Sequence, residues 1–216
     1  MLRHTQLWLS SIALAALMAS AGANIYTYTV TGPFRLPGAG TFGPLSVYPI
    51  VFNVPDSGLI ARVAITLGGL RHTRFDEIDA LLVSPTGTKV QFLSDAGGSR
   101  NPIGDYTFDD VNGTAPLPEF PVANPPPGVY TSSNYPPADS FPAPAPSPPY
   151  AFSLTAFFGE QMQGTWSLYI VDDSPGDTGS MQFARLEVEL IPEPASVVAL
   201  GAGLAGLLGL RRRRKA

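Results

Sequence analysis

The sequence predicts an all-β fold and, within that class, a jelly-roll-like antiparallel β-sandwich. Polar and apolar residues alternate with a period of two in 62–67 and 185–190, as they do in strands with one face in water. Short clusters of glycine, proline, aspartate and serine separate the apolar runs. Helical periodicity is confined to the two hydrophobic ends of the chain. Several short strands joined by turns are typical of sandwiches and jelly rolls.

The expected strands follow one another at short intervals along the body of the chain. We place them at residues 26–31, 46–54, 62–67, 79–84, 89–94, 165–172 and 185–190. Turn-forming residues separate several of them, at 68–69, 84–87, 97–98 and 173–177.

A proline-rich stretch from 116 to 149 interrupts the series of strands. It contains 13 prolines, including the run 125–127 and the alternating segment 142–146. Proline has no N–H to donate to a neighbouring strand and favours extended, solvated backbone. We expect a long stiff loop, either an Ω-like excursion or an unstructured insert, with polyproline docking to a partner as the alternative. Four aromatic residues are expected to hold it on the surface: Tyr130, Tyr135, Phe141 and Tyr150.

Residues 1–23 have the three parts of a secretory signal peptide. The basic start at Arg3 precedes an apolar segment at 7–18, and small residues follow up to Ala23. We expect a signal helix that is cleaved after Ala23, with Ala21 as the alternative position. The apolar segment is shorter than the about 20 residues of a membrane span, which disfavours an uncleaved anchor. The chain is therefore expected to be exported.

Residues 191–216 combine three elements in order. Pro192-Glu193-Pro194 precedes an apolar transmembrane segment at 195–210, and five cations follow: Arg211, Arg212, Arg213, Arg214 and Lys215. Cations beside a hydrophobic segment stay on the cytoplasmic side. The apolar segment would form about 24 Å of helix, short of the about 30 Å hydrocarbon core, and its four glycines weaken it further. We expect a sorting helix that anchors the chain transiently in the inner membrane and is processed; a lasting anchor is the alternative.

The net charge of the body disfavours some classes of function and favours others. Residues 24–190 contain 7 Lys and Arg against 16 Asp and Glu, which gives a net charge of −9. An acidic exported domain is a poor nucleic-acid binder and suits the binding of cations. The chain has no cysteine, which excludes thiol catalysis and cysteine-ligated zinc.

The sequence gives little support to catalysis. His72 is the only histidine beyond the signal peptide, and no Gly-x-Ser-x-Gly elbow accompanies it. Acidic pairs at 76–77, 109–110 and 172–173 have the residue types of a glycosidase, but neighbouring residues on a strand point to opposite faces. We expect that the chain is not an enzyme.

The acidic residues fit a calcium site better. Calcium takes several carboxylate and carbonyl oxygens, which flexible loops provide. The candidate ligands lie in or beside expected turns, which can converge at one end of a sandwich: Asp76, Asp95, Asp109, Asp110, Asp172, Asp173 and Asp177. The alternative is that aspartate favours turns because its side chain accepts hydrogen bonds from local amides.

Two groups of motifs resemble the P domain of proprotein convertases. The first comprises His72-Thr73, the acidic Asp76, Glu77 and Asp79, and Leu-Leu-Val-Ser-Pro-Thr-Gly-Thr at 81–88. The second comprises Gly159-Glu160, Gly164-Thr165-Trp166-Ser167-Leu168 and residues 172–179.

The resemblance spans about 59–190, within a P-domain-like body at 24–190, and implies a sandwich that holds calcium. It also implies a structural role for His72. The family commonly has a tryptophan where this chain has Ala184, so either Phe183 fills that space or the local packing differs. The proline-rich insert is foreign to the usual convertase domain.

The C-terminal segment is similar to PEP-CTERM sorting signals. The resemblance is carried by Pro192, Glu193 and Pro194, by the apolar segment 195–210, and by the arginines at 211–214. It implies processing by an exosortase in a bacterium that makes exopolysaccharide.

Two classes of function follow from these features. The first is a non-catalytic structural or adhesive module at the cell surface or in the extracellular matrix of a biofilm, with polysaccharide or surface proteins as partners. The alternative is a protease-associated accessory domain or a secreted hydrolase. A convertase P domain accompanies a separate catalytic domain, for which this chain has no room, and this favours the first class.

Overall fold

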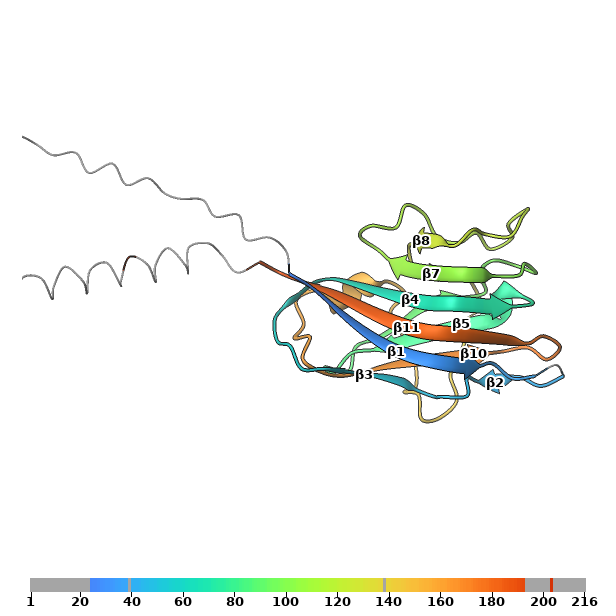
Figure 1. The fold of residues 1–216 in the computed structure, drawn as a ribbon, viewed down its shortest axis with the longest axis horizontal. Helices are drawn as coiled ribbons and strands as arrows, with labels where there is room; N and C mark the ends of the chain where they lie inside the picture. Colours follow the sequence, from blue (N-terminus) through green and yellow to red (C-terminus); the bar gives the residue numbers. More distant parts are fainter. Residues whose placement is uncertain (1–23, 39, 138, 193–202, 204–216) are drawn as a thin grey trace, which may run out of the picture. The chain divides into compact units, whose positions relative to one another are not determined.

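The computed structural model describes residues 24–38, 40–137, 139–192 and 203 of the chain. Two β-sheets form the body at 24–191 (Figure 1). The predicted signal helix in 1–23 lies outside the described residues, and so does the predicted sorting helix at 195–210, except for Gly203. Within the described ranges, no helix has the length and apolar character needed to cross a membrane.

The first sheet has five strands in the order β1-β11-β4-β7-β8. Their bounds are Ile25–Arg35 for β1, Gly179–Leu190 for β11, Ile60–His72 for β4, Ile103–Asp109 for β7 and Gly128–Tyr130 for β8. β11 pairs antiparallel with β1 and β4, and β4 pairs antiparallel with β7. β8 lies parallel to β7 at the edge of this sheet (Figure 1).

The second sheet has six strands, with the order β2-β10-β5-β6-β9 and β3 also on β10. Their bounds are Gly43–Pro44 for β2, Ile50–Val54 for β3, Ile78–Val83 for β5, Lys89–Ser94 for β6, Ser133–Asn134 for β9 and Gly164–Asp172 for β10. β3 pairs with the first half of β10 and β2 with its end. β9 lies parallel to β6, and two short 3-10 turns, η1 (Phe75–Glu77) and η2 (Leu154–Phe157), complete the body.

The all-β prediction is confirmed, but the purely antiparallel arrangement is wrong. The sheets are mixed because β8 and β9 both come from the proline-rich insert and add to the sheet edges in parallel. The finer description of the sandwich as a jelly roll stays a prediction. β7 was not expected from the sequence, because Gly104 and Asp105 dilute its alternation of apolar residues.

Large side chains from both sheets fill the core. Trp166 of β10 is fully buried, and its ring meets the ring of Phe157 edge to face at 5.0 Å. Its Nε1–H donates to the carbonyl oxygen of Met162 at 2.9 Å, so the buried indole has its partner. Phe92 of β6 and Phe108 of β7 pack with ring centroids 5.2 Å apart and join the two sheets.

The aromatic residues of the insert pin it to the body, as predicted. Tyr130 and Tyr135 pack against the main core. Phe141 and Tyr150 form a second cluster with Leu81, Tyr169 and Val171. Tyr169 and Val171 alternate along β10 with residues of the main core, so the second cluster lies on the opposite face of the sheet, which we call the outer face.

The structure shows what occupies the position at which the P-domain family commonly has a tryptophan and this chain has Ala184. Ala184 is buried in the core, whereas Phe183 points to the other face of β11. There its ring covers Gly68, the cross-strand partner, where an added Cβ would lie 2.1 Å from Phe183 Cζ. Phe183 therefore does not fill the core position, which the small side chain of Ala184 occupies.

Candidate metal centre

One end of the sandwich collects strand ends from both sheets. β4 ends at His72, β6 ends at Ser94 and β10 ends at Asp172, while β5 begins at Ile78. The register sets Asp172 directly opposite Ile78, so the turns that flank these strands lie close together. Their carboxylates define what we call the acidic end: Asp76, Glu77, Asp79, Asp95, Asp139, Asp172, Asp173 and Asp177.

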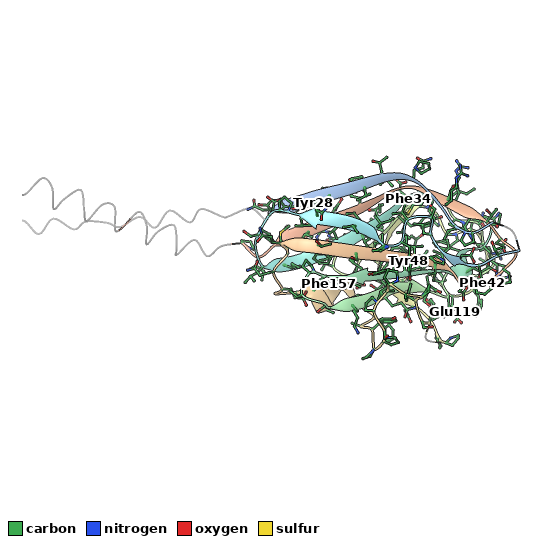
Figure 2. The ribbon with its side chains drawn as sticks, turned by 90° about the horizontal axis from the view of Figure 1, so that it is seen from below. Tyr28, Phe34, Phe42, Tyr48, Glu119 and Phe157 are labelled. Atoms are coloured by element: carbon green, nitrogen blue, oxygen red, sulfur yellow. The ribbon has the colours of Figure 1, made fainter. Side chains whose placement is uncertain are left out.

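The acidic end lies opposite the end at which the chain enters and leaves the body. Along β11, Glu189 pairs with Ile25 of β1 and Arg62 of β4, whereas Gly179 pairs with His72. Figure 2 shows the same polarity, with Phe42 and Glu119 towards one end of the body and Tyr28 towards the other.

Three carboxylates of the acidic end converge on one point. Asp79 from β5, Asp139 from the insert and Asp173 after β10 each place one oxygen within 4.8 Å of the other two. Asp79 is 1% exposed, and within the described part of the chain its Oδ2 has no hydrogen-bond partner. Burial, followed by the charges of Asp139 and Asp173, raises the pKa of Asp79 to about 9.

Polar residues at the end of β6 surround this point. The Ser94 hydroxyl and the Gln91 Nε2 amide, at 3.3 Å, both donate to Asp139 Oδ2. Asp95 follows with a positive φ of 51°, a backbone region that aspartate tolerates better than most residues. Burial and the nearby Asp139 raise the pKa of both Asp95 and Asp173 to about 6.

A second group, His72, Glu77 and Asp172, lies beside the first. His72 Nε2 lies 3.2 Å from Asp172 Oδ2, and Nδ1 contacts the backbone of Arg74. Glu77 Oε2 has no hydrogen-bond partner among the residues that the structure describes. Burial, with the charges of Asp177 and Asp172, raises the pKa of Glu77 to about 7.

The geometry of the first group fits a hard divalent cation. Calcium binds oxygens at about 2.3–2.6 Å, so two of its ligand oxygens lie up to about 5 Å apart. The three carboxylates meet this limit, and the buried Asp79 Oδ2 is an acceptor without a donor. In the second group, both ring nitrogens of His72 already have protein partners, so we centre the candidate site on Asp79, Asp139 and Asp173.

The structure brings five of the seven predicted aspartates to the acidic end and leaves two elsewhere. Asp109 pairs with Ala64 near the start of β4, at the opposite end of the sheet. Its carboxylate binds Arg62 and caps the amides of 111 and 112. Asp110 accepts from Ser132, Ser153 and the amide of 154. Both serve the structural role that the alternative reading assigned to aspartate in turns.

The prediction also missed three residues. Glu77 and Asp79 belong to the motifs that resemble a P domain, and their place near the start of β5 was the available signal. Asp139 gave no signal, because it stands in the proline-rich insert and only the fold brings it to Asp79.

Comparison with known proteins identifies two segments. Residues 144–188 match the family model of the proprotein convertase P-domain, and residues 190–214 match the PEP-CTERM protein-sorting motif. Both resemblances expected from the sequence are thereby confirmed. The P-domain match covers the second group of motifs, and the first group precedes it. No curated protein matches the chain.

Two solved structures of a serine protease of Aeromonas sobria are similar, one of them in complex with the chaperone ORF2. Both are 15% identical to this chain. The complex covers 79% of this chain and 27% of the protease chain, with a TM-score of 0.41. The protease without the chaperone covers 78% of this chain and 26% of the protease chain, with a TM-score of 0.40. The chain thus spans about a quarter of the length of these proteases.

The fold and the two matched segments define the class of this protein. It is an exported protein that an exosortase sorts to the cell surface, and it carries a P-domain-like β-sandwich.

Proposed function

We propose that the protein is a non-catalytic module of the cell surface or extracellular matrix, with a jelly-roll sandwich whose acidic end binds calcium. The observation that carries the calcium assignment is the buried Asp79 carboxylate: within the described part of the chain its Oδ2 has no hydrogen-bond partner, and one of its oxygens lies within 4.8 Å of two further carboxylates. The matched sorting motif supports delivery to the surface. There we assign the module a structural or adhesive role, with exopolysaccharide or surface proteins as its partners.

Calcium is the cation that suits these ligands best. The three carboxylates come from separate turns, and calcium accepts irregular oxygen coordination whereas magnesium demands a near-ideal octahedron. Zinc prefers nitrogen and sulfur ligands. The chain has no cysteine, and both ring nitrogens of His72 are engaged by other protein groups.

The surroundings of His72 support a structural role and not a catalytic one. The side chains of His72 and Asp172 have no exposed surface. A general base must reach the proton that it removes, and a substrate has no access to this imidazole without local unfolding. The His72–Asp172 contact instead ties the end of β4 to the end of β10.

The mass of the mature protein from its native host tests delivery. Exosortase processing predicts a C-terminus near Pro192–Pro194, and removal of the signal peptide predicts an N-terminus near residue 24. Retention of Leu210 and the arginines would favour a standing anchor.

Activity assays test the functional class. The full chain is expected to show no turnover of peptide or glycoside substrates, with or without calcium. Robust turnover that persists after repurification would support the secreted hydrolase instead.

A further inference from the structure

The candidate cation site is built from two parts of the chain that are separate in sequence. Asp79 and Asp173 belong to the sandwich, whereas Asp139 belongs to the proline-rich insert. Among the described residues, the Asp139 carboxylate accepts hydrogen bonds only from two neutral groups, the Ser94 hydroxyl and the Gln91 amide. The insert therefore brings a third carboxylate to the two that the sandwich supplies.

The segment that follows Asp139 covers apolar residues. From 139 to 150 it crosses the outer face of the second sheet, where Phe141, Ala145 and Tyr150 pack on Leu81 and Tyr169. Few polar contacts hold the segment in place: Tyr48 donates to the carbonyl of 142 at 3.0 Å, and Lys89 Nζ donates to the carbonyl of 147 at 2.7 Å. The same segment forms one wall of a surface groove, opposite Phe42–Pro44.

We propose that a calcium ion shared by Asp79, Asp139 and Asp173 latches residues 139–150 onto the outer face of the sandwich. This latch rests on the calcium site proposed above. The cation attracts all three carboxylates to one centre, and Asp139 is the first residue of the covering segment. Because five prolines between 142 and 149 stiffen the segment, fixing its start restrains its path over the sheet. Calcium thereby also sets the wall of the groove.

An introduced cysteine reports the latch directly, because the chain has no cysteine of its own. Ala145→Cys places a thiol on the side of the covering segment that packs on the outer face, and Val122→Cys, at a position 96% exposed, serves as the control. We expect a thiol reagent to label Ala145→Cys in the full chain at least about tenfold more slowly in calcium than in EGTA. At calcium about 100 times Kd, linkage permits a change of up to about 100-fold. Labelling of Val122→Cys should not respond to calcium.

Asp139→Asn tests whether the insert shares the ion. We expect titration calorimetry to show at least about tenfold weaker calcium binding, a change of about 1.4 kcal/mol, and Ala145→Cys in this background should label fast with and without calcium. Asp105→Asn, which removes one negative charge elsewhere, is the matched control. Hydrogen exchange of peptides from 139–150 in the unsubstituted chain gives the same readout if Ala145→Cys does not fold.

The outcomes distinguish a failure of the latch from a failure of the calcium site. Calcium binding with unchanged labelling and exchange would overturn the latch and leave the site intact. Unchanged calcium affinity in Asp139→Asn would overturn the sharing of the ion. Absence of calcium binding to the unsubstituted chain would overturn the site and the latch together.

Discussion

Asp79 is the residue on which the candidate site depends most. Its carboxylate is buried at the start of β5, and its pKa is raised to about 9 by burial and by Asp139 and Asp173. Without a cation, ionising it costs stability; with a cation, the same charge becomes a ligand. The isosteric amide separates these two effects.

Asp79→Asn is expected to stabilise the metal-free protein at pH 8 and to abolish stabilisation by calcium. At pH 8, below its raised pKa, the Asp79 carboxyl takes up a proton on folding, whereas the amide needs none. The gain in EGTA should therefore be at least about 1–3 kcal/mol of unfolding free energy. Denaturant unfolding with calcium and with EGTA measures both effects. The control Asp105→Asn should change neither. A full calcium response in Asp79→Asn contradicts the assigned ligand.

Gly179 shows a different constraint at the scale of one residue. A Cβ added there would lie 2.3 Å from His72 Cδ2 and 2.7 Å from the carbonyl oxygen of Arg71. Alanine therefore forces β11 away from β4 or moves the His72 ring away from Asp172.

Gly179→Ala is expected to destabilise the protein by about 1–3 kcal/mol, the typical cost of overpacking. Gly38→Ala is the control, because an added Cβ at residue 38 meets nothing within 4 Å. Equal unfolding midpoints for the two variants would show that β11 can move away from β4 without loss of stability.

At the scale of elements, Arg62 ties three strands of the first sheet together. From β4 its Nη1 lies 2.8 Å from Asp109 of β7, and its Nε lies 2.8 Å from Glu189 of β11. The Arg62 and Asp109 side chains are only 7% and 4% exposed. Each charge is therefore balanced mainly by its partners and not by water.

Arg62→Ala is expected to cost about 3–5 kcal/mol, because it leaves the Asp109 carboxylate buried without its cation. Arg185→Ala removes a more exposed cation, 36% accessible, that pairs with Glu187, and should cost about 1 kcal/mol or less. Chemical unfolding of both variants measures the difference. Similar small losses would mean that water reaches Asp109 in Arg62→Ala.

The strands with a clear period-two pattern could be predicted from the sequence, and those defined by tertiary pairing could not. β4, β10 and β11 carry long alternating or apolar runs that mark them. β8 and β9 have three and two residues, too few for a pattern, and exist because β7 and β6 offer them a free edge.

The same limit applies to the candidate site. Turn composition predicted that aspartates cluster, and it found Asp173 and Asp95. It did not find Asp139, whose neighbours in space are dozens of residues away along the chain. Nor did turn composition distinguish Asp109 and Asp110 from the aspartates of the candidate site. An aspartate that caps a turn and one that can bind a cation have the same local sequence.

At the scale of the whole molecule, the acidic end makes metal-free stability depend on pH. Asp79, Glu77, Asp95 and Asp173 all have a pKa raised in the folded state. The pKa values of these groups in the unfolded state are about 4. At a pH between these values and the folded-state pKa values, the native state holds protons that the unfolded state has released. Stability is therefore highest below this window and falls as pH rises through it.

In EGTA, the denaturant midpoint is expected to be higher at pH 5 than at pH 8.5. Saturating calcium should shrink or reverse the difference, because ionised carboxylates bind the metal. A metal-free midpoint that rises with pH would contradict the raised pKa values.

The sorting motif and the candidate metal site belong to opposite ends of the body. Leu190 and Ile191, the first residues of the matched sorting motif, lie at the end opposite the acidic end.

The most direct test of the central claim is the thermal unfolding of the chain in calcium and in EGTA at pH 8. With calcium at about 100 times Kd, linkage adds about 2.7 kcal/mol. For a domain of this size, that corresponds to a rise in Tm of roughly 5–10 °C. We expect this rise for the unsubstituted chain and none for Asp79→Asn. An unchanged Tm in the unsubstituted chain would contradict a calcium site at the acidic end.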